Sequence, residues 1–290
     1  MVRKVMILAA CCTIFFANCF AQNHTIPVID LQYPESLNIF LFHQQDSIDL
    51  STAVNSHREF KKIIQHLSKK QAQMRTEEEF LRELFYYVHS KKLKSYNKYA
   101  VMRETLENGT YGCLTGTALY ANLLSAFNYG YEIVKLPKHV FIQVNTKKGY
   151  YIVESTLPRE GFRKLDSSIL PCLEPNEQNI RKSLSLEVVG NWYGATEVTD
   201  QPFELIGLKE LAGLQHFNEA VNLYSQNNFE DAIDRATEAY KLYPTKRNHE
   251  LMQLIVNKIL RHDVLTGELR SQILNQYVSM VKTKKLSQTK

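Results

Sequence analysis

The sequence predicts an α+β fold, in which a helix packs on an antiparallel sheet, followed by an α-helical, repeat-like segment. Three observations support this fold class. Apolar residues recur at helical spacing in the first third of the chain, strand-like runs cluster between residues 132 and 156, and the chain from Leu208 onward has helical patterns. With 290 residues, 44% of them hydrophobic, the chain is long enough to bury a sizeable core.

The N-terminus has the pattern of an export signal. Arg3 and Lys4 form a basic start, residues 5–20 are an apolar run, and Ala21 is a small residue before a cleavage point ahead of Gln22. This run of about 16 residues is short for a membrane span, which needs about 20. We expect residues 1–21 to be a signal peptide and the protein to be exported, to the periplasm or outside the cell. A buried first helix is the alternative.

The cysteines divide between this signal and the rest of the chain. Cys11 ends "LAAC" and Cys19 ends "FANC", both similar to a lipobox, so a lipid anchor is an alternative to simple secretion. With Cys12 also in the signal, only Cys113 and Cys172 remain after cleavage, which excludes a disulfide scaffold. One bridge between these two stays open and would block thiol chemistry. Otherwise Cys172 is expected to be buried and structural.

Charge and motifs exclude several classes of function. Loss of Arg3 and Lys4 with the signal leaves 33 basic against 30 acidic side chains, with no basic stripe interleaved with aromatic residues, so nucleic acid is not an expected partner. No phosphate-binding loop or dinucleotide fingerprint occurs, and no His or Cys pair has the spacing of metal ligands. We therefore expect neither a cofactor nor a metal.

The first third of the chain predicts two structural helices after an extended entry. The apolar pieces "IPVIDL" and "LNIFLF", within residues 22–45, are interpreted as extended. Apolar residues between 55 and 70 recur at helical spacing. A second helix starts at Thr76, where Glu79 three residues later completes a capping box and lysines end the helix. His66 and His89 lie on these helices and are expected to be structural.

The middle of the chain predicts a helix followed by a β-hairpin. The helix spans about 113–127, a turn follows at "NYGY", and strands are expected at 132–136, 139–145 and 150–156. The last two flank "TKKG", a polar loop that ends in glycine, as in a hairpin. After Phe162 the pattern is less regular and is interpreted as connecting structure.

The C-terminal helices contain one tetratricopeptide-like repeat. Its aromatic, small and proline positions have the expected spacings, and they are Tyr224, Phe229, Ala232, Ala239 and Pro244. A peptide-binding concave surface normally needs at least three repeats. The segment is therefore either a helical buttress or a surface for a protein partner. The terminal "KTKKLSQTK" is expected to be a solvated tail.

Cys113, His139 and Glu154 are the candidate catalytic residues. A cysteine at a helix start after Gly112 is favoured as thiolate by the helix dipole, and His139 at a strand entrance could act as its base. Taken alone, a cysteine before an apolar helix is more often buried and inert.

Hairpin numbering supplies a third group. If Asn145 pairs with Tyr150, then His139 faces Thr156, and Glu154 is a diagonal neighbour on the same face, within reach of the imidazole. A bulge that shifted the register by one residue would turn Glu154 away.

A cysteine at a helix start, a histidine opening a strand and an acid ending its partner strand resemble the transglutaminase-like family, a branch of the papain-like fold. The resemblance covers about residues 96–157. It implies that Cys113 is the nucleophile, His139 the base and Glu154 the orienting acid, although Glu replaces the more usual Asp and a second oxyanion donor is unassigned. The C-terminal helices add a similarity to bacterial members that carry tetratricopeptide repeats.

These interpretations give a complete organisation. Residues 22–205 form the transglutaminase-like domain, with its core at about 96–157, residues 206–282 form the helical tetratricopeptide-like segment, and residues 283–290 form a flexible tail. We expect an exported thiol enzyme that transfers acyl groups from amides, most simply a hydrolase of peptide or isopeptide bonds. The alternative is a catalytically silent scaffold that binds a protein or cell-wall partner.

Overall fold

The computed structural model describes residues 35–41, 50–165 and 204–261, together with 267–268, 270–271, 273–275 and 277–278. The predicted signal peptide with its three cysteines, the "IPVIDL" run, Cys172, most of the predicted connecting structure and the C-terminal tail lie outside the described residues. No helix within the described ranges is long and apolar enough to cross a membrane.

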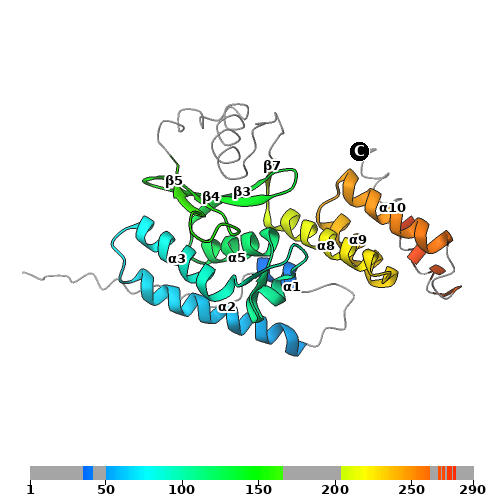
Figure 1. The fold of residues 1–290 in the computed structure, drawn as a ribbon, viewed down its shortest axis with the longest axis horizontal. Coiled ribbons are helices and arrows are strands. Elements are labelled where there is room, and N and C mark those ends of the chain that lie inside the picture. Colours follow the sequence, from blue (N-terminus) through cyan, green and yellow to red (C-terminus); the bar gives the residue numbers. More distant parts are fainter. Residues whose placement is uncertain are drawn as a thin grey trace, which may run out of the picture. The chain divides into compact units, whose positions relative to one another are not determined.

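An antiparallel sheet of five strands and the helices packed on it confirm the α+β class (Figure 1). The strands lie in the order β6-β5-β4-β3-β7. Their bounds are β3 Gly130–Lys135, β4 Val140–Thr146, β5 Gly149–Val153, β6 Phe162–Lys164 and β7 Glu204–Ile206. β6 and β7 were not predicted, because each has only three residues and no period can be read from so short a run.

The hairpin between β4 and β5 has the predicted register. Asn145 pairs with Tyr150 and Thr146 with Gly149. The loop "TKKG" makes the reversal, with Gly149 at a φ of +129° that other residues rarely adopt. The pairing is free of a bulge as far as Ile142. The prediction that the second strand continues to residue 156 was wrong, because β5 ends at Val153 and residues 155–156 form a turn, so Thr156 is not paired with His139 in the sheet.

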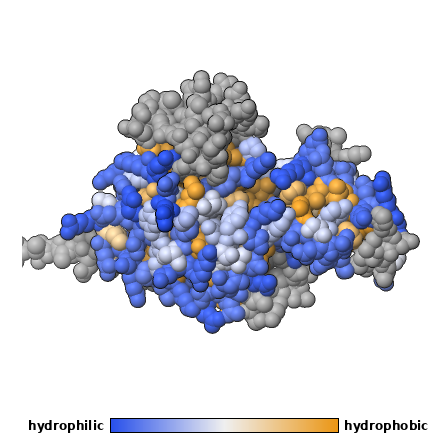
Figure 2. All heavy atoms as spheres, viewed as in Figure 1, coloured by the Kyte–Doolittle hydropathy of each residue, from blue (hydrophilic) through white to orange (hydrophobic). Residues whose placement is uncertain are grey.

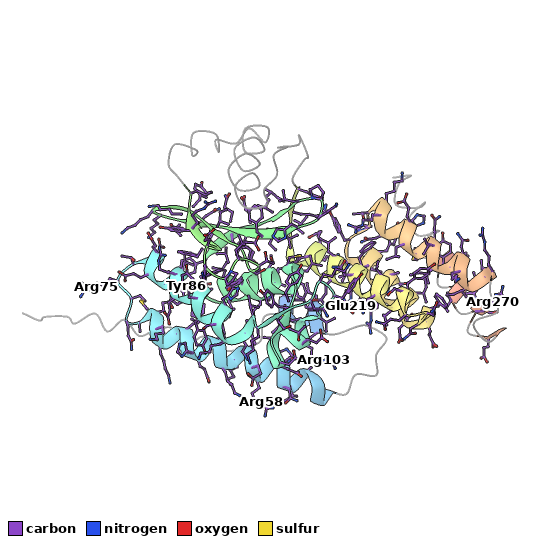
Figure 3. The ribbon with its side chains drawn as sticks, viewed as in Figure 1. Arg58, Arg75, Tyr86, Arg103, Glu219 and Arg270 are labelled. Carbon is purple, nitrogen blue, oxygen red and sulfur yellow. The ribbon has the colours of Figure 1, made fainter. Side chains whose placement is uncertain are left out.

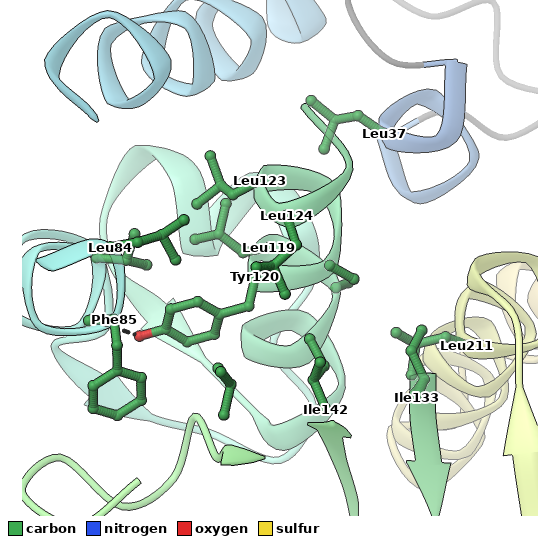
Figure 4. Packing of buried hydrophobic residues seen from close by; sticks show 14 of the residues in the cluster. Leu37, Leu84, Phe85, Leu119, Tyr120, Leu123, Leu124, Ile133, Ile142 and Leu211 are labelled. Atoms are coloured by element: carbon green, nitrogen blue, oxygen red, sulfur yellow. Dashed lines mark hydrogen bonds between the residues drawn. The ribbon is translucent and has the colours of Figure 1, made fainter. Parts of the chain in front are cut away.

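Helix α5 (Cys113–Ala126) is the centre of the core. Its sequence is apolar on every side, as expected of a helix surrounded by other elements, and it packs against β3, β4, α4 and α8. The surrounding cluster includes residues of α3 and the sheet (Figure 4). The buried hydroxyl of Tyr120 donates to the carbonyl of Phe85 at 2.9 Å, which satisfies the one polar atom of this large side chain.

Helices α2 (Leu50–Gln71) and α3 (Glu77–Lys92) agree with the sequence patterns. The predicted apolar face of α2 is buried, namely Phe60, Ile63, Ile64 and Leu67. At the start of α3, Glu79 N–H donates to Thr76 Oγ1 at 3.1 Å, as a capping box requires. The Glu79 carboxylate accepts a hydrogen bond from the N–H of Arg75, whereas a capping box predicts the N–H of Thr76 as its donor.

The interpretation of "LNIFLF" as extended was wrong. Residues Glu35–Leu41 form helix α1. Leu37 and Phe40 are buried and three residues apart, so they share one face of a helix. The run is too short for helical periodicity to be distinguished from a strand by sequence.

Two short strands that the sequence did not reveal precede α5. β1 (Ser95–Tyr96) pairs in parallel with β2 (Thr110–Tyr111), and α4 (Met102–Glu107) connects them. Residue Tyr96 therefore lies beside Tyr111, with the two rings edge to face at 5.8 Å. This pair brings Tyr96 next to the start of α5.

The C-terminal helices are α8 (Leu208–Ser225), α9 (Phe229–Leu242) and α10 (Lys246–Arg261). Ala232 and Ala239 are fully buried, in agreement with the close helix approach that the repeat pattern predicts. In Figure 2, hydrophobic residues gather over these helices, whereas most of the face in view is hydrophilic. Glu219 of α8 (Figure 3) lies 3.6 Å from Arg235 of α9 and joins the two helices.

Helix α8 also belongs to the core of the α+β part. Leu211, Ala212 and Leu214 lie in the same buried cluster as α5 and the sheet. A second cluster holds α9 and α10 together. The first of the C-terminal helices is therefore packed into the same interior as the hairpin.

Candidate functional site

Cys113 is the first residue of α5 and is partly exposed. Gly112 immediately before it has extended backbone, and its N–H donates to Thr115 Oγ1 at 3.0 Å. A side chain at Gly112 would meet the carbonyl oxygen of Asn97 at 2.8 Å, so glycine allows the β1 loop to approach the helix start. The thiol thus lies at the positive end of the helix dipole, where negative charge on sulfur is stabilised.

His139 and Glu154 meet beyond the ends of β4 and β5. His139 Nε2 lies 2.5 Å from Glu154 Oε2, and the carboxylate is fully buried. The other oxygen, Glu154 Oε1, accepts from the N–H and from the hydroxyl of Thr156, each at 2.7 Å. Hydrogen bonds to His139 and Thr156 thus satisfy both oxygens of this buried carboxylate.

The imidazole of His139 lies between the carboxylate and the thiol. Burial lowers the pKa of His139, but hydrogen bonds to Cys113 and Glu154 and the charges of both groups outweigh burial and raise that pKa to about 9 from an ordinary 6.5. Since Glu154 engages Nε2, Nδ1 is the ring nitrogen left for the thiol. The raised pKa favours the protonated form of the His139 ring at neutral pH.

Two glycines let the hairpin end approach α5. A side chain at Gly116, one turn after Cys113, would meet Cβ and Oγ of Ser155 at 2.6 Å. A side chain at Gly161 would meet the carbonyl oxygen of Glu154 at 2.2 Å. Gly161 also exchanges backbone hydrogen bonds with its surroundings, accepting from the Glu154 N–H at 2.8 Å. The position of the acid therefore depends on two close backbone approaches.

The end of the hairpin has a further anchor on α3. The His89 ring hydrogen-bonds with the backbone of Ser155, and burial of the ring lowers the pKa of His89. A neutral imidazole suits this buried position, since its charged form would lose water. His89 Nε2 is buried without a hydrogen-bond partner among the described residues, so the structural role that the sequence predicted for His89 stays a prediction.

A cavity of about 400 Å³ opens onto the thiol and the imidazole. Cys113, His139 and Tyr96 line it, together with residues of α8 and α10. Burial and the charge of Cys113 both raise the pKa of Tyr96, so its hydroxyl keeps its proton at neutral pH. Sequence reasoning missed Tyr96, because only the parallel pairing of β1 with β2, fifteen residues apart, brings it to the thiol.

This cavity is smaller than another one in the molecule. A cavity of about 530 Å³ is lined by residues of α1, α4, α8 and α9, among them Arg103, Glu104 and Asp231. Its described lining includes neither a thiol nor an imidazole. Two further cavities, of about 450 and 550 Å³, are also larger than the cavity at Cys113, so volume does not select a site, whereas the chemistry of the side chains favours the cavity at Cys113.

Within the described parts of the chain, no group of three or more His, Cys, Asp or Glu side chains is arranged to hold a metal ion. Comparison with known proteins gives no family: the chain matches no protein-family model, no curated protein sequence and no solved structure. The arrangement of Cys113, His139 and Glu154 must therefore be interpreted from its own geometry.

Proposed function

We propose that this protein is a thiol enzyme that transfers acyl groups from amide bonds, with Cys113 as nucleophile, His139 as proton carrier and Glu154 as the acid that orients His139. The observation that carries the proposal is the imidazole held between a thiol at a helix start and a fully buried carboxylate. A triad of nucleophile, base and orienting acid has this geometry.

The reaction begins with the thiolate of Cys113 and the protonated ring of His139. Sulfur attacks the carbonyl carbon of the amide and forms the C–S bond, and the carbonyl oxygen takes the negative charge. The His139 ring then donates its proton to the amide nitrogen, the C–N bond breaks and the amine leaves. A water molecule gives a proton to His139 and attacks the thioester, which releases the carboxylic acid and restores the thiolate.

Two donors are available for the oxyanion. The N–H of Cys113 lies in the first turn of α5, where backbone N–H groups have no partner within the helix. We propose the Tyr96 hydroxyl as the second donor, since Tyr96 lines the same cavity and its raised pKa keeps the hydroxyl protonated. This supplies a donor that the sequence alone did not assign.

The order of elements supports a transglutaminase-like, papain-like organisation as part of the proposal. The helix that begins with Cys113 packs on an antiparallel sheet, and the His and the acid come from adjacent strand ends. Glutamate in place of aspartate is accommodated, because Thr156 holds the second oxygen of the longer side chain. Export and hydrolysis of a peptide or isopeptide bond remain parts of the proposal that rest on the sequence.

The test is the rate at which Cys113 is alkylated by iodoacetamide at mildly acidic pH, followed by mass spectrometry of its peptide. In folded protein we expect Cys113 to react faster than it does after denaturation, because a helix start and a neighbouring imidazole both favour a nucleophilic sulfur. His139→Gln should abolish this advantage.

If folded Cys113 reacts no faster than the denatured chain at pH 5 to 6, the thiol is not activated and the silent scaffold is favoured instead. A second measurement compares the biological effect of the protein with that of the variant Cys113→Ala. The variant should lose this effect if the protein is an enzyme and keep it if the protein is a scaffold. The two measurements separate a failure of thiol activation from a failure to find the substrate.

A further inference from the structure

Besides Cys113 and Leu114 at the start of α5, three distant parts of the chain line the cavity at Cys113. Tyr96 of β1 and Lys98, two residues later, form one wall, and residues 135–140, from the end of β3 to the start of β4, form the second. The third wall consists of C-terminal residues, namely Leu214, Phe217 and Arg247. The side-chain amide of Asn218, on α8, donates to the Lys98 carbonyl at 3.3 Å and connects two of these walls. The C-terminal helices thus contribute to the cavity itself.

The charged side chains that line this cavity have one sign. Among the described residues that line it, the charged side chains other than the imidazole are all basic: Lys98, Lys135, Lys138 and Arg247. Lys135 is compensated by Glu204, whose carboxylate lies 2.7 Å from its ammonium group. Lys98, Lys138 and Arg247 are exposed, and they give the entrance a positive potential.

Arg247 is also held in place on an apolar surface. Its guanidinium carbon lies 4.2 Å from the centre of the Phe217 ring, and this ring is itself buried. A guanidinium stacked on a ring keeps the N–H groups at its edge available for a carboxylate, and stacking reduces the freedom lost on binding. Leu136, Pro137 and Leu214 supply apolar surface beside it.

We propose that the acyl donor is a peptide that carries a carboxylate close to the scissile amide, bound by Arg247 with Lys138 and Lys98, and an apolar group that packs beside Phe217. This inference rests on the proposed function, since it specifies the substrate of that site. The carboxylate comes either from an acidic side chain or from the C-terminus of the peptide, and the two sources share the same recognition.

The first test needs no substrate. Iodoacetate and iodoacetamide alkylate the same sulfur and differ in charge, so the ratio of their rates at Cys113 reports the field of the cavity. For Arg247→Gln and Lys138→Gln we expect this ratio to fall by about two- to fivefold for each cation removed. Arg247→Glu should lower it further. Lys148→Gln, at the exposed hairpin turn, removes the same charge outside the cavity and should leave the ratio unchanged.

The outcomes separate this inference from the proposed function. If Cys113 is inert to both reagents, the proposed function fails. If Cys113 is activated but the ratio in Arg247→Gln and Lys138→Gln equals that in Lys148→Gln, the inference is overturned while the enzyme proposal stands. Circular dichroism of each variant confirms folding, and both rates are measured on the same sample.

A second arm distinguishes the sources of the carboxylate. Three blocked dipeptides are tested for protection of Cys113 from iodoacetamide: acetyl-Leu-Gln-amide, acetyl-Leu-Glu-amide and acetyl-Leu-Gln with a free terminal carboxylate. We expect one of the acidic peptides to protect better than the neutral one, and Arg247→Gln to remove the difference. Equal protection by all three, or none by any, would count against a carboxylate-bearing donor.

Discussion

Glu154 shows how one buried side chain can determine the state of a site. Its carboxylate accepts from three donors, two from Thr156 and one from His139, and is screened from water. The charge is thereby fixed beside the imidazole, where it helps to raise the pKa of His139. Replacing the acid by its amide keeps the shape and removes the charge.

For Glu154→Gln we therefore expect the pKa of His139 to fall from about 9, because a hydrogen bond and a charge that raise it are both lost while burial still lowers it. In the pH profile of the acyl-transfer rate, the alkaline limb should move to lower pH. The maximal rate should drop by a factor on the order of 10² or more. A titration of the His139 ring by NMR measures the first effect directly. An unchanged midpoint would show that the carboxylate does not control the imidazole.

The same shift predicts a pH dependence of stability. The pKa of His139 in the folded protein, about 9, lies above the ordinary value of 6.5, so protonated His139 stabilises the fold. This contribution is complete below pH 6.5 and is lost as the pH rises through 9. The difference in the free energy of unfolding between the protein and His139→Gln should narrow over this window, as measured by urea denaturation at successive pH values.

At the scale of elements, the contact between α5 and the end of β5 decides whether the three side chains meet. Gly116 and Ser155 touch where the helix and the hairpin end cross. The His and the acid belong to one hairpin, whereas the thiol belongs to the helix. The distance between thiol and imidazole therefore follows from this packing.

Gly116→Ala should destabilise the protein by about 1–3 kcal/mol and slow alkylation of Cys113, because the new methyl group would lie 2.6 Å from the Ser155 side chain. Removing that side chain in the double variant Gly116→Ala, Ser155→Gly should restore part of the loss. Gly130→Ala is the matched control, since no atom lies within 4 Å of its added methyl group. Equal effects at Gly116 and Gly130 would exclude a packing role.

At this scale, the sequence predicted the features that depend on residues close together in the chain. The capped start of α3, the helix at Cys113 and the hairpin register depend on residues a few positions apart, and the structure has them as expected. Tyr96 and β7 depend on pairings with distant segments, which no local pattern encodes. Roles in catalysis depend on these distant contacts too, and they stay predictions.

For the whole molecule, the shared core implies that the C-terminal helices and the sheet unfold together. Leu211 of α8 is fully buried in the cluster that contains Ile133 of β3 (Figure 4). A repeat segment that is attached only by a linker would have a hydrophobic core of its own, whereas α8 is buried in the same cluster as the sheet. The prediction from sequence of a separate helical segment does not include this continuity.

Leu211→Ala should lower the free energy of unfolding by about 2–5 kcal/mol, because the space left by the side chain is far from water. The helical signal and the enhanced alkylation of Cys113 at mildly acidic pH should be lost at the same denaturant concentration. Leu254→Ala, on the exposed side of α10, should have little effect. Two separate transitions in Leu211→Ala would mean that the helices fold on their own.

The hydrogen bond between Asn218 and Lys98 joins residues 120 positions apart in the chain. A ribosome completes Cys113, His139 and Glu154 well before it makes Asn218 and Arg247. Because α8 shares its buried interior with α5 and the sheet, we expect these three side chains to come together only after the ribosome has also made α8. The arrangement at Cys113 is then a late product of synthesis, although its residues are made early.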